Sequence, residues 1–430
     1  MNRSFNSKYD IVNFMRIKAD ANHIQRVAII ILLALITLSF FHSPGQGDVG
    51  FWLKWIKTVD THGPLMTFES RERSPLGSEA VQEGYPPFMS FISFSTAKLA
   101  HLFSIDYLTA LKLSLTIFLF SASFIFWTWT RDFFVTAIFH FSLLVNSIML
   151  VYIDIYFVPT LILSLWAIKE RNLKAFTIFF SVSCLIKWQP IIIAPFILLY
   201  ILNINKIAEW KEINFKGIAF NVLSPLIIIV IITFSLFGMP FLKSFTSAVT
   251  EPYLSGDALN FGWIMTYFLH VFFPDKFGYL INGEANYIMT TSLKLMLLPK
   301  LLFFISYATA FLAFFRKEKN FENLIYYSLI GFLAYFIFNT GVHENHLFIA
   351  AILAVILFFI NREYVMASAF IIIMSNVNLI IFFGTDGKGL GFSRVAGVDI
   401  TLLFSLLNVV FFLFFWKSAC LQWKSTCMTS

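Results

Sequence analysis

Residues 336–360 read FIFNTGVHENHLFIAAILAVILFFI, a short cluster of polar residues between two strongly apolar runs. Apolar runs of this kind recur along the whole chain. Of its 430 residues, 58% are hydrophobic and 13% are charged, whereas soluble domains average about 45–50% apolar and about 25% charged residues. Because a water-soluble fold cannot bury so much apolar surface, the composition excludes a soluble globular protein and predicts an integral membrane protein.

Twelve apolar stretches are long enough to cross a bilayer, which takes about 20 residues with some shorter spans tolerated. They are 27–43, 88–104, 108–128, 133–152, 156–168, 174–202, 218–237, 298–315, 323–339, 346–360, 364–383 and 400–416. The stretch 174–202 is long enough for two short helices. We therefore predict one all-α polytopic membrane domain over residues 27–416 with about 11–13 transmembrane helices, and a first span that is an anchor rather than a removed signal peptide.

Basic residues in the connections predict the orientation of the chain, because cytoplasmic loops are enriched in Lys and Arg. The basic segments are the arm 1–26, 169–174, 206–216, 316–319, Arg362 and the tail 417–430. These short runs account for the net charge of +7, so we predict no nucleic-acid partner. The opposite, outer side then holds 44–87, 238–297, 340–345 and 384–399. One segment between 88 and 174 must be re-entrant or interfacial. If all of them crossed the membrane, the number of crossings would be one too many for both ends of the chain to be cytoplasmic.

The two long outer loops, 44–87 and 238–297, are expected to carry the function, since long loops in compact proteins are usually functional. In the first loop, Asp48 precedes apolar residues at helical spacing, namely Phe51, Trp52, Trp55, Ile56 and Val59. An amphipathic helix on the outer surface would hold this carboxylate at the boundary between lipid and water. The alternative is that Asp48 only caps that helix.

Two charged residues, Asp154 and Lys187, lie in otherwise apolar surroundings. An ionisable group inside a membrane is costly and marks a functional site by default. Lys187, followed by Gln189, would suit a phosphate. The alternatives are that Asp154 lies harmlessly at a helix end and that Lys187 reaches the interface with its long side chain.

The cluster from His343 to His346 is the most informative polar segment. His343 and His346 are three residues apart and could share a helix face, but the cluster is not the His-Glu-x-x-His zinc signature and has no further Cys or His ligand nearby. It indicates a set of donors for a phosphate or for sugar hydroxyls at the mouth of a membrane cavity. The alternative is a polar helix cap.

In the second outer loop, Asn260 and Trp263 follow Glu251-Pro252-Tyr253 and Asp257. Acid, amide and aromatic groups at close spacing suit a carbohydrate, and they equally suit an interfacial belt of Trp and Tyr.

Taken in order, these features resemble the GT-C superfamily of membrane glycosyltransferases, which use polyprenyl-phosphate sugars as donors. The matching elements are Asp48 soon after the first span, Tyr85-Pro86-Pro87 before the second, Asp154, Lys187-x-Gln189-Pro190, Asn260-x-x-Trp263, and His343-Glu344-x-His346. The match extends over residues 27–350 and is similar to the branches in which His-Glu follows a late span. It implies a GT-C-like fold whose long extracytoplasmic loops carry short amphipathic helices.

The resemblance also implies roles for these residues. Asp48 matches the general base that activates the acceptor hydroxyl for an inverting transfer. The residues expected to bind the donor phosphate are Lys187, Gln189, His343, His346, Arg71 and Arg73. Those expected to bind the sugar or the acceptor are Tyr85, Asp154, Asn260, Trp263 and Glu344. The first loop has a single Asp48 where metal-dependent members have an acidic pair, so no metal or other cofactor is predicted, although a divalent ion remains an option.

The expected partners are a polyprenyl-phosphate-linked sugar, a glycan or lipid-linked acceptor, and membrane lipid. Because the chain ends shortly after the last predicted span, we expect transfer of one sugar rather than of a whole oligosaccharide. The only Asn-x-Ser/Thr sequon, at Asn2, lies in the predicted cytoplasmic arm. This favours a bacterial inner membrane, with the active site facing the periplasm.

Two other classes fit parts of the sequence. A transporter or flippase could use Asp154 and Lys187 as a coupling pair, but no inverted repeat is visible. A polysaccharide polymerase or ligase of the O-antigen type usually depends on arginines in a large late outer loop, and the loop 238–297 contains none.

Overall fold

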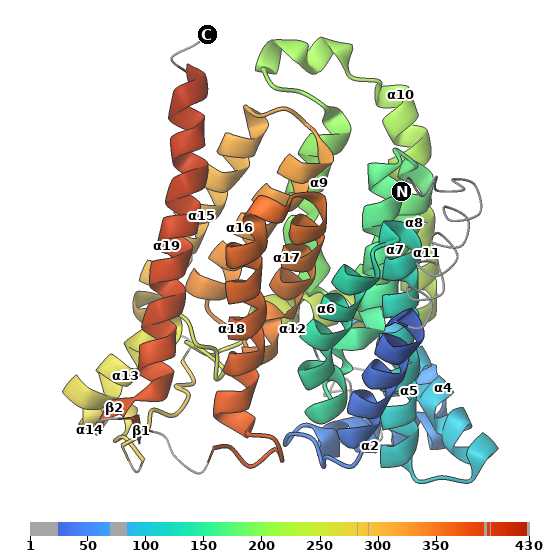
Figure 1. Cartoon of the computed structure of the whole chain (residues 1–430), viewed down its shortest axis with the longest axis vertical. Helices are drawn as coiled ribbons and strands as arrows, with labels where there is room; N and C mark the ends of the chain where they lie inside the picture. Colours follow the sequence, from blue (N-terminus) through green and yellow to red (C-terminus); the bar gives the residue numbers. More distant parts are fainter. Residues whose placement is uncertain are drawn as a thin grey trace, which may run out of the picture.

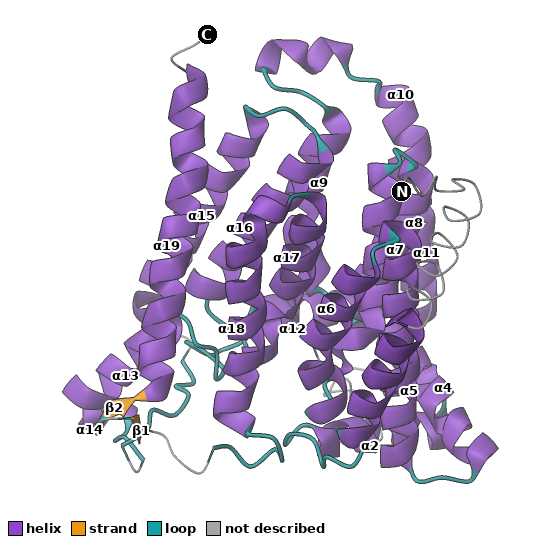
Figure 2. Ribbon diagram, viewed as in Figure 1, coloured by secondary structure: helices purple, strands orange, loops and turns teal. Residues whose placement is uncertain are grey.

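The computed structural model of the chain is an elongated helical bundle (Figures 1 and 2). It describes residues 25–68, 84–281, 283–290, 292–390, 394–395 and 397–427. The first described helix is Gln25–Ser39. It is followed by α2 (Val49–His62), α3 (Pro64–Thr67), α4 (Phe88–Phe103), α5 (Tyr107–Thr130), α6 (Phe133–Leu144), α7 (Val158–Lys169), α8 (Leu173–Ile186), α9 (Ala194–Leu202), α10 (Phe215–Ile218), α11 (Ser224–Phe237), α12 (Met239–Val249), α13 (Phe261–Phe272), α14 (Pro274–Phe277), α15 (Leu293–Phe315), α16 (Phe321–Phe338), α17 (Phe348–Ile360), α18 (Val365–Phe383) and α19 (Ile400–Cys427). The predicted all-α class is confirmed, and the described strands are the short antiparallel pair β1 (Arg394–Val395) and β2 (Val398–Asp399).

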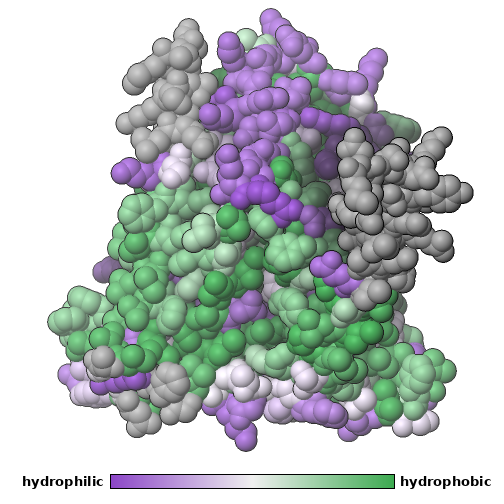
Figure 3. Space-filling model, viewed as in Figure 1, coloured by the Kyte–Doolittle hydropathy of each residue, from purple (hydrophilic) through white to green (hydrophobic). Residues whose placement is uncertain are grey.

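Six helices in the described part of the chain are long and apolar enough to cross a membrane. They are Tyr107–Thr130, Phe215–Phe237, Leu293–Phe315, Phe321–Phe338, Arg362–Phe383 and Ile400–Ala419. The surface in Figure 3 has an apolar belt between more polar ends. These properties are compatible with an integral membrane protein.

The core of the bundle is built around α16 and α17. In the apolar window of α16, 78% of the residues are buried, against 11% in the helix Phe215–Phe237. All residues of α17 from Phe348 to Phe358 are buried. The helices α16 and Phe215–Phe237 are both apolar on every side. Their different burial therefore shows that α16 packs inside the protein and that Phe215–Phe237 presents its side chains outward.

The apolar stretch 174–202 forms two helices, as its length allowed. The helix α8 ends at Ile186, and Lys187 takes an extended conformation with φ −147° and ψ 133°. A 3₁₀ turn over Gln189–Ile193, with Pro190 in its first turn, then leads into α9. The break therefore falls on the polar residues of this stretch, and it brings Lys187 and Gln189 out of regular helix geometry.

The predicted span 88–104 corresponds to α4, which is not among the helices that are apolar enough to cross a membrane. It packs extensively against α2, and both helices lie at the lower end of the bundle in Figure 1. Asp60 on α2 joins the two helices by contacts to Lys98 and His101 of α4 at 3.2 and 2.6 Å. The helix α4 thus packs against α2 at one end of the bundle, and its crossing of a membrane stays a prediction.

The long predicted outer loops contain short helices, with α2 and α3 in the first and α12, α13 and α14 in the second. The helix α2 buries Val49, Trp52, Trp55, Ile56 and Val59, which confirms the amphipathic helix predicted there. In Figure 1, α2, α13 and α14 lie at the same end of the bundle, whereas α10 and the basic connection 206–216 lie at the opposite end.

Candidate functional site

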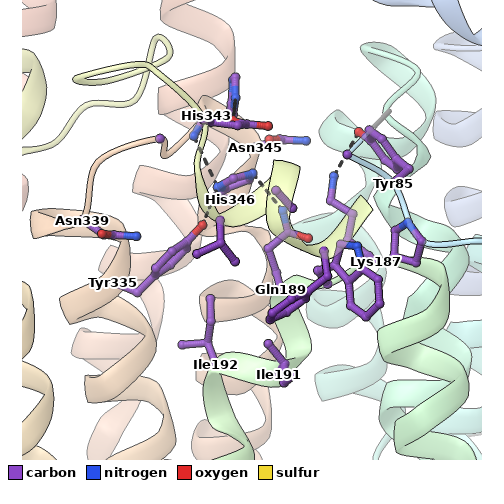
Figure 4. Close-up of a pocket in the computed structure, with 18 of the residues that line it drawn as sticks. Tyr85, Lys187, Gln189, Ile191, Ile192, Tyr335, Asn339, His343, Asn345 and His346 are labelled. Atoms are coloured by element: carbon purple, nitrogen blue, oxygen red, sulfur yellow. Dashed lines mark hydrogen bonds and ion pairs between the residues drawn. The ribbon is translucent and has the colours of Figure 1, made fainter. Parts of the chain in front are cut away.

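A cavity of about 420 Å³ opens between α2, the α8–α9 break, α12 and the connection from α16 to α17. Its polar wall contains most of the site residues predicted from the sequence (Figure 4). Its polar lining comprises Asp48, Tyr85, Tyr152, Lys187, Gln189, Glu251, Tyr335, Asn339, Thr340, His343, Glu344, Asn345 and His346. The cavity therefore joins segments that are far apart in the sequence.

Asp48 lies at the start of α2, but its side chain makes no capping hydrogen bond, so the capping alternative does not account for it. Its backbone N–H donates to Gln46 Oε1 at 2.6 Å, which fixes the backbone and leaves the carboxylate in the cavity. Burial raises the pKa of Asp48, and the cations of His343 and Lys187 oppose this rise. A carboxylate with a raised pKa is a better proton acceptor near neutral pH.

Lys187 and Asp154 form a buried ion pair with an Nζ to Oδ1 distance of 2.7 Å. The other oxygen of Asp154 accepts from Asn345 Nδ2 at 2.8 Å and from Asn146 Nδ2 at 3.4 Å. Asp154 lies in the 3₁₀ turn that leads into α7, so its predicted helix-end position is right, but its side chain is buried and paired. Lys187 is also buried and does not reach the interface. Partners on both oxygens are what a buried carboxylate needs to stay charged.

Tyr85 connects Lys187 to an aromatic group on α2. Lys187 Nζ donates to Tyr85 Oη at 3.2 Å, and the Tyr85 ring packs edge-on against Trp52 and Trp55 at 5.4 and 5.3 Å between centroids. Tyr85 thus holds the cation and the two indole rings in a fixed arrangement on one side of the cavity.

His343 pairs with Glu251 across the cavity mouth, with 2.5 Å between His343 Nε2 and Glu251 Oε2. Burial opposes protonation of His343, but the hydrogen bond and the charge of Glu251 outweigh it and raise the pKa of His343 to about 9. His343 is therefore a cation at neutral pH. Lys187 and His343 thus place two positive charges in the described part of the cavity wall.

His346 has a different role, because its ring is held by neutral groups. Its Nδ1 accepts from the His343 backbone N–H at 3.3 Å and lies 3.0 Å from the Tyr335 hydroxyl, while its Nε2 lies 2.9 Å from the amide of Gln189. A nitrogen that faces a backbone N–H must be unprotonated. His346 is therefore a neutral ring that orients the Gln189 amide rather than a second imidazolium.

Glu344 and Asn345 face the inner end of the cavity. Tyr152 donates its hydroxyl to Glu344 Oε1, and Asn378 Nδ2 donates to the Glu344 carbonyl at 2.8 Å. Asn345 reaches Asp154, so the polar cluster also fixes the buried ion pair. The helix-cap alternative holds in part, because His346 accepts the His343 backbone N–H at the start of the 3₁₀ turn Glu344–Leu347. The long-range contacts of Glu344 and Asn345 go beyond what a cap needs.

The rest of the cavity lining is apolar, and part of it is open to the outside. The exposed members are Phe51 on α2, Ile191 in the 3₁₀ turn, and Phe245 and Val249 on α12. Trp188 packs against Phe245 at 5.1 Å between ring centroids. The cavity thus combines a charged inner wall with an apolar rim, as an amphiphilic ligand requires.

Three of the predicted residues that the structure describes do not line this cavity: Asp154, which lies behind Lys187, Asn260 and Trp263. The Asn260 side chain caps α13 by accepting from the Trp263 backbone N–H at 3.0 Å. Trp263 is buried, and its indole N–H donates to Thr401 Oγ1 at 2.7 Å, so Asn260 acts as a helix cap and Trp263 packs inside the protein. Arg71 and Arg73 lie outside the described residues.

Glu251, Tyr335 and Tyr152 line the cavity but were not among the predicted site residues. The sequence does contain a signal for Glu251, since it lies in the acid-rich and aromatic part of the second outer loop. Tyr335 and Tyr152 lie in apolar segments and have no local signal. In the described part of the chain, no group of three or more His, Cys, Asp or Glu side chains is arranged to hold a metal ion.

Comparison with known proteins identifies no relative: no protein-family model matches the chain, and no curated protein matches its sequence significantly. The function must therefore be argued from the cavity itself.

Proposed function

We propose that the chain is an inverting glycosyltransferase of the GT-C type, which moves a single sugar from a polyprenyl-phosphate donor to a lipid-linked or cell-envelope glycan. The observation that carries this proposal is the single cavity in which the Asp48 carboxylate shares one space with Lys187 and His343. Its exposed apolar rim suits a polyprenyl chain.

In the proposed reaction, Asp48 accepts the proton of the acceptor hydroxyl, whose oxygen attacks the anomeric carbon of the donor sugar. The bond from this carbon to the phosphate oxygen breaks, and its electron pair leaves with the polyprenyl phosphate. The leaving phosphate gains one negative charge, so cations placed beside it lower the barrier. Lys187 and His343 are the described residues that supply them, and Arg71 and Arg73 are further candidates.

The proposed topology has twelve crossings. The six long helices are joined by the shorter ones Gln25–Ser39, Phe133–Met149, Leu173–Ile186, Gln189–Leu202 and Glu344–Ile360, and by α7 with the turn before it. The helices α2, α4 and α13 then lie on the outer surface. An even number returns both ends to the cytoplasm, in agreement with the basic connections. We further propose a bacterial inner membrane and a periplasmic site.

The test uses the purified full chain in detergent with a panel of polyprenyl-phosphate hexoses, with the products identified by mass spectrometry. Asp48→Asn should lower turnover about 10²–10⁴-fold, since it removes the general base and keeps the shape of the side chain. Asp106→Asn is the matched control, because Asp106 caps α5 outside the cavity and Asn also caps helices. Full activity of Asp48→Asn would refute the mechanism.

A transporter is the second candidate, because Asp154 and Lys187 form a buried pair of opposite charges of the kind that couples transport to an ion gradient. The same protein in proteoliposomes separates the two functions. Uptake of substrate without a covalent product would favour the transporter, whereas a glycosylated product without uptake would favour the transferase.

A further inference from the structure

Glu251 belongs to a segment that is bonded along its length to the segment containing His343. The Gly256 N–H donates to the Val342 carbonyl at 2.9 Å, and the Glu344 N–H donates to the Gly256 carbonyl at 3.0 Å. Three residues earlier, the Gly341 N–H donates to the Tyr253 carbonyl at 2.9 Å. These backbone hydrogen bonds of residues 253–256 therefore fix the backbone on both sides of His343, independently of any side-chain contact.

The same segment also shapes the space around the His343 ring. Gly256 lies so close that an added Cβ would be 2.6 Å from His343 Nδ1, so only glycine leaves room for the imidazole. The Tyr253 ring packs edge-on against it at 5.5 Å. With Glu251 on Nε2, the ring is thus held from three positions of one segment.

We propose that Glu251 is a positioning residue of the donor site, which holds His343 cationic and in place to receive the phosphate of the donor. The proposal rests on the function proposed above and extends its donor site to the second outer loop. Glu251 does not act on the reacting atoms itself. It acts through His343, in the way that a carboxylate beside an imidazole fixes its charge and its orientation.

Several charged groups besides Glu251 influence the protonation of His343. They are Glu344, whose Oε2 lies 3.9 Å from His343 Nδ1, Lys187 at the end of α8, and Asp48 and Asp257. The titratable ring of His346, which is neutral, lies 5.3 Å from the His343 ring. The hydrogen bond to Glu251 contributes most toward protonation, whereas burial and Lys187 oppose it. Removal of the Glu251 charge should therefore leave the imidazole neutral at pH 8.

The first experiment measures His343 directly by NMR titration of histidine-labelled full-length protein, with the signal assigned by its loss in His343→Gln. The pKa should be about 9 in the wild type and should be clearly lower in Glu251→Gln. An unchanged pKa in Glu251→Gln would overturn the proposal. This measurement requires no substrate, so it tests the role of Glu251 even if the proposed reaction is wrong.

The second experiment measures binding of undecaprenyl phosphate to the full chain in nanodiscs at pH 6 and pH 8. Glu251→Gln should weaken binding at pH 8 at least about 10-fold, since each pH unit above a pKa lowers the protonated fraction tenfold. Part of the binding should return at pH 6, because a lower pH protonates more of the imidazole. Glu251→Asp should restore part of the affinity at pH 8, and Glu284→Gln, the same exchange elsewhere in this loop, should bind as the wild type does.

An equal loss at both pH values would indicate a merely structural role and would overturn the proposal. If the wild type binds no undecaprenyl phosphate while the NMR titration behaves as expected, the proposed donor is wrong and the control of His343 by Glu251 stands.

Discussion

The two ion pairs of the cavity differ in their burial and in how firmly they are held. The side chains of Asp154 and Lys187 are 3% and 9% exposed, and two asparagine amides donate to the carboxylate. The side chains of Glu251 and His343 are each 32% exposed, and they join two loop segments. A buried pair is costly to break because the remaining charge has no solvent, whereas a half-exposed pair with a titratable member can change its charge with pH. The first pair therefore belongs to the scaffold of the site and the second to its adjustable part.

Breaking the buried pair should have the largest effect on folding. Asp154→Asn leaves Lys187 as an uncompensated buried cation, so the free energy of unfolding should fall by about 3–5 kcal/mol. The measurement is denaturant or thermal unfolding of the full chain in detergent.

Asp132→Asn is the matched control for this variant. It breaks the Asp132–Arg362 pair, whose side chains are 30% and 50% exposed, and should cost less than about 1 kcal/mol. Equal destabilisation by the two substitutions would contradict the distinction between the pairs. The double variant Asp154→Asn with Lys187→Gln should recover stability without recovering activity.

Breaking the half-exposed pair should affect binding rather than folding. His343→Gln removes a charged donor to the phosphate, and hydrogen bonds to charged groups contribute about 1.5–3 kcal/mol, or about 10–10²-fold in kcat/KM. Stability should change little. The measurement is turnover against donor concentration beside the melting temperature, with His101→Gln on α4 as a control outside the cavity. A melting temperature as low as that of Asp154→Asn would show that the second pair is also structural.

The smallest effect on donor binding is expected from a change at Tyr85, which contacts Lys187 of the buried pair and the indole rings on α2. Tyr85→Phe removes the hydroxyl that accepts from Lys187 and keeps the ring between Trp52 and Trp55. A hydrogen bond to a charged group contributes about 1.5–3 kcal/mol. Because Lys187 keeps its ion pair with Asp154, KM for the donor should rise by only about 2–10-fold. Tyr156→Phe removes a buried hydroxyl outside the cavity, bonded to Ser114, and should leave KM unchanged. If both variants raise KM equally, Tyr85 has no special role.

Much of the scaffold could be predicted from local patterns. The period of the apolar residues after Asp48 predicted α2 and its buried face, and the length of 174–202 predicted two helices. The position of the break at Lys187 came from the structure. The prediction that 88–104 crosses the membrane stays a prediction, because apolar content alone does not distinguish a helix that crosses a bilayer from one that packs at the end of a bundle.

The site was predictable where polar residues stand out against apolar neighbours, as Lys187 and His343 do. Their partners were not predictable, because the contacts join residues distant in the sequence. Glu251 and His343 are 92 residues apart, and Tyr152 and Glu344 are 192 apart. Asn260 and Trp263 show the converse case, since residue types that suit a sugar serve here as a helix cap and a buried indole.

The pairing of 253–256 with 341–344 also constrains when the site can form during synthesis. The first of these segments leaves the ribosome long before the second, and until then the Tyr253 carbonyl and the Gly256 N–H and carbonyl lack their partners in 341–344. Unpaired backbone groups are costly away from water, so the early part of the chain cannot keep this wall in its final shape. The ability to bind a lipid phosphate should therefore arise only after α16 and the 341–344 segment have been inserted, late in the assembly of the protein.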